Sequence, residues 1–111
     1  MKDDQIRVFQ GQKIEILKMA LSNLDNQLML SLEINFENTI YRIIFHNVSG
    51  VSMYNMSIPL EVHGFEIINH SQSGWEKNFK YEIYDFEDNR INFFCEDFEI
   101  EDNRKDVGSL P

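Results

Sequence analysis

Hydrophobic and polar residues alternate most regularly between Gln27 and Phe36. The apolar set consists of Leu28, Leu30, Leu32, Ile34 and Phe36, and the residues between them are Gln27, Met29, Ser31, Glu33 and Asn35. A two-residue period is what a strand with one buried face requires, because successive side chains point to opposite sides of a sheet. This segment is therefore predicted to be a half-buried strand, ended by the turn-prone pair Glu37-Asn38.

The segment that follows, Thr39–Val48 (TIYRIIFHNV), is predicted to return as a second strand. It is apolar on both faces: Tyr41, Ile43 and Phe45 share one, and Ile40, Ile44 and Val48 share the other. Such a strand belongs in the middle of a sandwich or barrel.

The preceding segment, Lys13–Ser22, fits two structures. Ile14, Leu17, Leu21 and Leu24 match a helical stripe, whereas the alternation from Ile14 also matches a strand. We favour the strand, because Asn23–Asn26 has turn chemistry and leads into the clearest strand of the chain. A short strand at Ile6 and Val8 is expected before Gly11, which breaks it.

The stretch Gly74–Asp102 holds three apolar-aromatic runs separated by short polar breaks: Lys80–Tyr84, Ile91–Cys95 and Phe98–Ile100. Asp88-Asn89 is a turn-prone pair that tolerates positive φ. Tyr81–Phe86 and Arg90–Cys95 are therefore predicted to form a hairpin.

The whole chain favours strands over helices. Asn47–Pro59 is irregular and predicted to be a loop with one short strand, followed by short strands at Leu60–His63 and Gly64–Asn69. Phe and Ile are abundant, and Ala occurs once. Seven or eight short strands predict an all-β fold, an antiparallel sandwich or a partly open barrel. The 111 residues suit a single domain, 1–111, with loose termini at 1–5 and 103–111.

Charge and cysteine content narrow the partners and the compartment. The net charge of −9 disfavours nucleic acid and anionic membrane as partners and favours a basic protein. The chain has one cysteine, no apolar signal segment after Met1 and no apolar run of about 20 residues. A cytoplasmic location is the simplest expectation.

Residues with catalytic or metal-binding chemistry form no recognisable motif. His46, His63, His70 and Cys95 lack the spacing of a compact metal site. Glu96 and Asp97 follow Cys95 directly and oppose formation of a reactive thiolate. The segment Asp85–Asn89 lacks the glycine and the closing glutamate of a calcium loop. We therefore expect no enzyme activity, no metal and no cofactor.

Acidic residues are concentrated between Glu82 and Asp102, where nine carboxylates face one base, Arg90. Such a charge run is either a solvated surface or a docking site for a basic partner. Trp75 is either a recognition residue or a core residue at one end of the domain. The candidate partner-binding residues are Trp75, Asp85, Glu87, Asp88, Glu96, Asp97 and Glu99.

Three segments resemble a known family: YRIIFHNVSGV (Tyr41–Val51), GFEIINH (Gly64–His70) and GWEKNFKYEIYDFEDNRINFFCEDFEI (Gly74–Ile100). They look like the small YxiG-like proteins of Gram-positive bacteria, which are similar to families found beside polymorphic toxin genes and regarded as immunity proteins. The resemblance covers roughly Leu28 to Ile100 and is most specific in its Gly-Trp-Glu and Phe-Cys-Glu-Asp pieces. It implies a cytoplasmic binding protein that neutralises a toxin, and it supplies no catalytic residues.

Two functions follow as hypotheses. The first is an immunity-type protein whose acidic β-face docks on a basic toxin such as a nuclease. The second is a structural module that forms a homodimer through edge strands and through Met53, Tyr54 and Met56. The sequence leaves open whether the acidic residues gather on one face.

Overall fold

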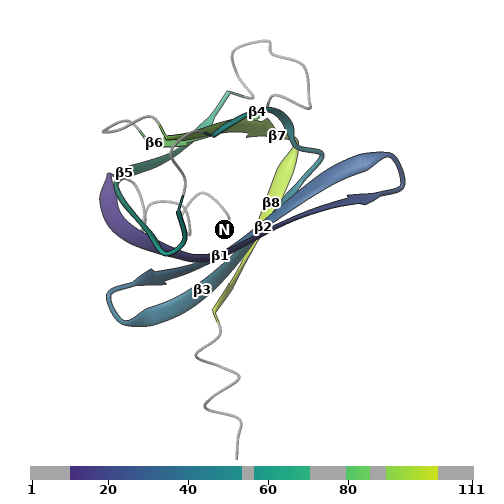
Figure 1. The fold of residues 1–111 in the computed structure, drawn as a ribbon. Helices are drawn as coiled ribbons and strands as arrows, with labels where there is room; N and C mark the ends of the chain where they lie inside the picture. The colour runs from purple at the N-terminus through teal and green to yellow at the C-terminus, as the bar shows by residue number, and fades with distance from the viewer. Residues whose placement is uncertain (1–10, 54–56, 71–79, 86–89, 103–111) are drawn as a thin grey trace, which may run out of the picture.

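The computed structural model describes residues 11–53, 57–70, 80–85 and 90–102, which form one antiparallel sheet of eight strands (Figure 1). The strands are β1 (Gln12–Leu24), β2 (Gln27–Phe36), β3 (Thr39–His46), β4 (Ser49–Met53), β5 (Leu60–Asn69), β6 (Tyr81–Asp85), β7 (Ile91–Cys95) and β8 (Asp97–Asp102). Their order in the sheet is β4-β7-β6-β5-β1-β2-β3-β8. The all-β, antiparallel prediction is confirmed, and the sheet is not closed into a barrel.

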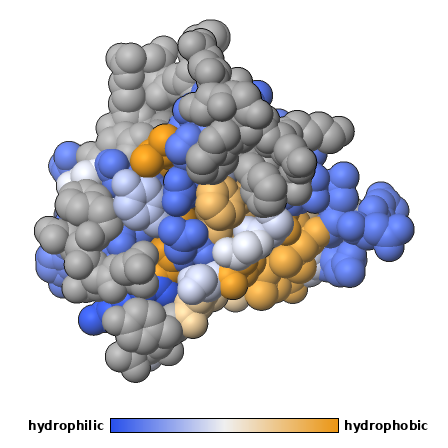
Figure 2. Space-filling view, turned by 90° about the horizontal axis from the view of Figure 1, so that it is seen from above, coloured by the Kyte–Doolittle hydropathy of each residue, from blue (hydrophilic) through white to orange (hydrophobic). Residues whose placement is uncertain are grey.

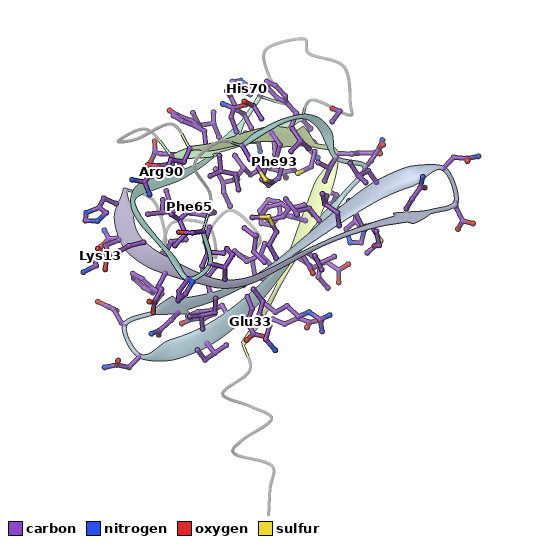
Figure 3. All side chains as sticks on the ribbon, in the orientation of Figure 1. Lys13, Glu33, Phe65, His70, Arg90 and Phe93 are labelled. Carbon is purple, nitrogen blue, oxygen red and sulfur yellow. The ribbon has the colours of Figure 1, made fainter. Side chains whose placement is uncertain are left out.

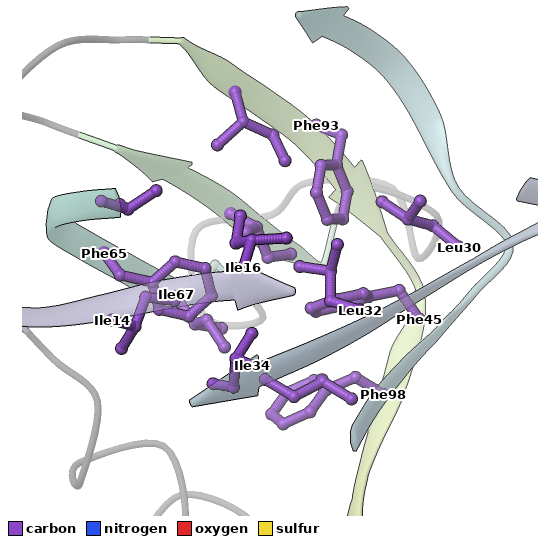
Figure 4. Packing of buried hydrophobic residues seen from close by; sticks show 14 of the residues in the cluster. Ile14, Ile16, Leu30, Leu32, Ile34, Phe45, Phe65, Ile67, Phe93 and Phe98 are labelled. Carbon is purple, nitrogen blue, oxygen red and sulfur yellow. The ribbon is translucent and has the colours of Figure 1, made fainter. Parts of the chain in front are cut away.

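The sheet folds over on itself, so that its two halves enclose a single core (Figure 1). One half contains β1, β2, β3 and β8, and the other contains β5, β6, β7 and β4. Aromatic rings join the halves: Tyr81 of β6 meets Phe98 of β8 edge to face, with centroids 4.9 Å apart. Phe65 and Phe93 point into the space between the halves, whereas Glu33 and His70 point away from it (Figure 3). Figure 4 shows how the buried aliphatic and aromatic side chains fill this space.

The ambiguous segment after Gly11 is a strand, as favoured from the sequence. Ile14 and Ile16 are buried, and Ile16 lies opposite Ile34 of β2. The next pair is Lys18 with Glu33, so Leu17 is an extra residue that forms a bulge. The bulge brings Met19 opposite Leu32 and so keeps apolar residues on the core side of the strand.

Residues 18–29 of β1 and β2 form a hairpin that extends beyond the rest of the sheet, which we call the arm (Figure 1). Its β1 residues lie beyond the pairing with β5, and its β2 residues precede the pairing with β3. Leu21 on the arm is 53% exposed. Figure 2, which keeps the arm at the right, shows polar residues at its tip and apolar residues beside them.

The two short strands predicted at Leu60–His63 and Gly64–Asn69 are one continuous strand, β5. Opposite β1, the pairing shifts from Gln12 with Phe65 to Ile14 with Val62. The extra residue on β5 interrupts the alternation, so Val62 and Phe65 are both buried. This break in periodicity is why the sequence pattern suggested two strands.

The predicted hairpin is confirmed as β6 and β7, paired from Tyr81 opposite Cys95 to Tyr84 opposite Asn92. The short strand expected in the irregular middle is β4, at the edge of the sheet beside β7. The predicted strand at Ile6 and Val8, the loose termini, and residues Tyr54 and Met56 lie outside the described residues.

Two connections between the halves of the sheet lie side by side and are joined by hydrogen bonds. One leads from β3 to β4 and the other from β7 to β8. The backbone N–H of Glu96 donates to the carbonyl of His46 at 3.0 Å, and that of Val48 donates to the carbonyl of Leu28 at 2.8 Å. The side-chain amide of Asn47 donates to Glu96 Oε1 at 3.1 Å. The two bonds of Glu96 place the start of β8 beside the end of β3, and the bond of Val48 ties the β3–β4 connection to β2.

Candidate functional site

Strand β8 presents three carboxylates on its outer face. Asp97, Glu99 and Glu101 are exposed and point outward, because they alternate with Phe98, which is buried, and Ile100, which packs against the core. Three acidic side chains therefore follow one another along the surface of a single strand.

Three residues of β3 lie directly beside these carboxylates. Arg42 is opposite Glu101, Ile44 is opposite Glu99, and His46 is opposite Asp97. We call these six residues the β8 outer face. It combines three carboxylates with one guanidinium, one imidazole and one half-buried aliphatic side chain.

The polar contacts within the β8 outer face lie at the protein surface. His46 Nε2 lies 2.6 Å from Glu99 Oε2, and Arg42 Nη1 lies 4.0 Å from Glu101 Oε1. Exposed pairs of this kind contribute about 0–1 kcal/mol, because water competes for both partners. The carboxylates can therefore exchange these contacts for contacts with a binding partner at little cost.

Charges alternate in sign across the middle of this half of the sheet. A row across four strands alternates in sign: Lys18 on β1, Glu33 on β2, Arg42 on β3 and Glu101 on β8. A hollow of about 300 Å³ lies along this row and is lined by Lys18, Met19, Ala20, Ser31, Leu32, Glu33 and Arg42. Along this row each carboxylate therefore lies beside a cation.

The predicted partner-binding residues do not all meet at this face. Asp97 and Glu99 lie on it, and Glu96 is partly buried in its hydrogen bond with Asn47. The prediction that Asp85 lies on the exposed acidic face is wrong. Its side chain is 0% exposed, and it lies opposite Phe65. Trp75, Glu87 and Asp88 lie outside the described residues.

Acidic residues on the other half of the sheet form a separate environment. Glu82 points outward from β6 and lies 2.9 Å from His70 Nε2. The pKa of the neighbouring Tyr84 hydroxyl is raised by partial burial and by the charges of Glu66 and Glu82. The carboxylates of Glu82 and Glu99 thus belong to different halves, so the acidic stretch does not share one face.

The histidines and the cysteine are not gathered into a site. His46, His63 and His70 each contact a different glutamate, and Cys95 is buried. Among the residues that the structure describes, no cluster of metal-binding side chains is found.

A second hollow of about 460 Å³ lies near the turn between β2 and β3. It is lined by Gln12, Lys13, Ile14, Glu15, Asn35, Phe36, Glu37, Asn38 and Glu61. Lys13 Nζ lies 3.3 Å from Glu61 Oε2, and this ammonium, with His63, holds the pKa of the Glu61 carboxyl below its usual range. Within this hollow Lys13 thus pairs with Glu61, whereas the buried Oδ1 of Asn35 has no hydrogen-bond partner among the described residues.

Comparisons with protein-family models, with curated proteins and with solved structures gave no match to this chain. Within the described residues, no helix is long and apolar enough to cross a membrane. Of the features that sequence reasoning missed, the largest is the contribution of β3 to the β8 outer face. Arg42, Ile44 and His46 alternate along β3, but only the strand pairing shows that they adjoin the acidic residues.

Proposed function

We propose that this protein is a non-enzymatic binding protein that docks a basic protein partner on the β8 outer face. The observation that carries the proposal is the line of exposed carboxylates, Asp97, Glu99 and Glu101, on one strand. The resemblance to YxiG-like proteins gives the partner a role: a bacterial toxin, such as a nuclease, that the protein neutralises in the cytoplasm.

Electrostatics support fast and selective association with such a partner. The whole chain carries a net charge of −9, which attracts a basic protein over a distance of about 10 Å at moderate salt. Complementary charge mainly raises the association rate and excludes wrongly charged partners. Ile44, half-buried in the middle of the β8 outer face, offers the apolar contact that slows dissociation.

A pull-down with two matched variants tests the proposal. The tagged protein is expressed in its native host and purified at low salt, and co-purifying proteins are identified by mass spectrometry. Glu99→Lys reverses a charge on the β8 outer face, whereas Glu37→Lys makes the same charge change at the exposed turn between β2 and β3.

The expected result is one basic protein in equimolar amount with the wild type and with Glu37→Lys. It is lost with Glu99→Lys and at high salt. When the captured basic protein is expressed alone, it should arrest growth. Co-expression of the wild-type binding protein should restore growth. Equal recovery with Glu99→Lys would show that docking does not use the β8 outer face, and a captured protein without toxicity would remove the immunity role.

A second candidate, self-association, is supported by the exposure of Leu21 on the arm. Light scattering after size exclusion distinguishes the two functions. A dimer that dissociates in Leu21→Glu would favour self-association, whereas a monomeric wild type would count against it.

A further inference from the structure

Strand β8 ends the described sheet on the side opposite β4. It pairs with β3 along one edge, and the described residues provide no strand beside its other edge. Alternate N–H and C=O groups of such an edge strand point away from the sheet and are a template for another strand.

The two ends of the sheet differ in how well they suit this role. Strand β4 has five residues, and its pairing with β7 shifts between Ser49 and Ser52, next to Gly50 with its φ of 61°. Bulges of this kind twist an edge and hinder further pairing. Strand β8 pairs with β3 without a shift over six residues, from His46 opposite Asp97 to Tyr41 opposite Asp102. It is therefore the more regular template.

Charge disfavours a second copy of β8 as the occupant. If two β8 strands paired antiparallel about a two-fold axis at Glu99, that residue would face itself and Asp97 would face Glu101. Like charges directly opposite each other destabilise a strand pair. The same three carboxylates stabilise a pair with a strand that carries cations at alternate positions.

On the core side of β8, an added strand would need an apolar side chain. Ile100 packs against the core but stays partly exposed, and its register partner Ile43 is fully buried. An apolar side chain on an added strand, placed between the cations, would cover the exposed part of Ile100.

We propose that the partner supplies an extended segment of alternating basic and apolar residues, which pairs with the outer edge of β8 from Glu99 to Glu101, where the described residues place no other strand. Its Lys or Arg side chains face Glu99 and Glu101, and its apolar side chains lie beside Ile100. This inference rests on the proposed function and adds to it that the contact is made through the backbone as well as through charge.

A synthetic peptide tests the backbone contact directly. The probe is an acetylated, amidated seven-residue peptide of alternating lysine and valine. The control is the same peptide with its internal amides N-methylated, which keeps the charges and side chains but removes the hydrogen-bond donors. Binding to the wild type, to Glu99→Lys and to Glu37→Lys is measured by calorimetry at low salt. Amide hydrogen exchange of Glu99, Ile100 and Glu101 is followed by NMR.

The inference predicts that the unmodified peptide binds the wild type and Glu37→Lys and slows amide exchange within residues 99–101. N-methylation and Glu99→Lys should each weaken binding at least about tenfold, which corresponds to the loss of one or two hydrogen bonds or of a charge pair. Equal binding of the two peptides would overturn strand pairing while leaving charge-driven docking intact. No binding of the unmodified peptide would also overturn it, and the pull-down would still test the proposed function separately.

Discussion

The rings of Phe45 and Phe93 meet edge to face with their centroids 4.9 Å apart, although β3 and β7 lie in opposite halves of the folded sheet. This geometry is favourable because the positive edge of one ring faces the negative face of the other. Both side chains are fully buried (Figure 4). The pair therefore links the two halves at the centre of the core.

Replacing Phe93 with alanine should lower the free energy of unfolding by about 3–5 kcal/mol, because it removes the ring contact and leaves a cavity. Leu21→Ala, on the exposed arm, should change it by about 0.5 kcal/mol or less. Urea unfolding followed by fluorescence measures both. Similar values for the two variants would contradict the assignment of Phe93 to the core.

Gly50 and Gly11 have similar positive φ angles, 61° and 66°, so alanine variants at the two positions can be compared directly. An alanine at either position pays about 1–2 kcal/mol for the left-handed conformation. At Gly50 the added Cβ would also lie 3.2 Å from Cδ2 of Phe94, whereas at Gly11 it would meet no atom within 4 Å. Gly50→Ala should therefore be the more destabilising variant in thermal unfolding. The reverse order would show that β4 does not lie against Phe94 as described.

The hydrogen bond between Asn47 and Glu96 should contribute measurably to the stability of the two connections between the halves of the sheet. A double-mutant cycle with Asn47→Gly and Glu96→Ala should give a coupling energy of about 1–2 kcal/mol, since a partly buried bond to a charged group is involved. Glycine is chosen because Asn47 has a positive φ of 55°. The exposed pair His46–Glu99 serves as the control and should couple by about 1 kcal/mol or less. Equal coupling energies in both cycles would contradict a special contribution of the Asn47–Glu96 hydrogen bond.

The lowered pKa of Glu61 predicts a pH effect with a definite sign. Its main causes are hydrogen bonding to Lys13 and to His63. Because the folded-state pKa lies below the ordinary value of 4.5, the stabilisation is present above that value and is lost as the pH falls through the folded pKa.

Lys13→Gln should therefore raise the Glu61 pKa in an NMR titration of the carboxyl carbon, whereas Lys18→Gln, whose side chain lies near Glu33 in the register, should leave it unchanged. An unchanged Glu61 pKa in Lys13→Gln would remove Lys13 as its cause.

Strand formation and the faces of individual strands could be predicted from local periodicity. The alternation in β2 correctly assigned its buried face, and the predicted hairpin correctly paired β6 with β7. The alternation within β6 also indicated that Asp85 is buried, but this signal was not used in the prediction. Asp85 continues the inward series of Tyr81 and Ile83, and the structure buries it with them.

The sequence by itself therefore determined the all-β class, the main hairpin and the negative charge of the chain, because these depend on residue type and on a period of two along one strand. Tertiary structure alone decided that β8 pairs with β3, that bulges at Leu17 and in β5 reset the register, and that Glu82 and Glu99 lie on different halves. A two-residue period states which side chains share a face of one strand, but it contains no information on which strand lies alongside. That choice depends on long-range packing between the halves, and it is what brings Arg42, Ile44 and His46 to the acidic edge.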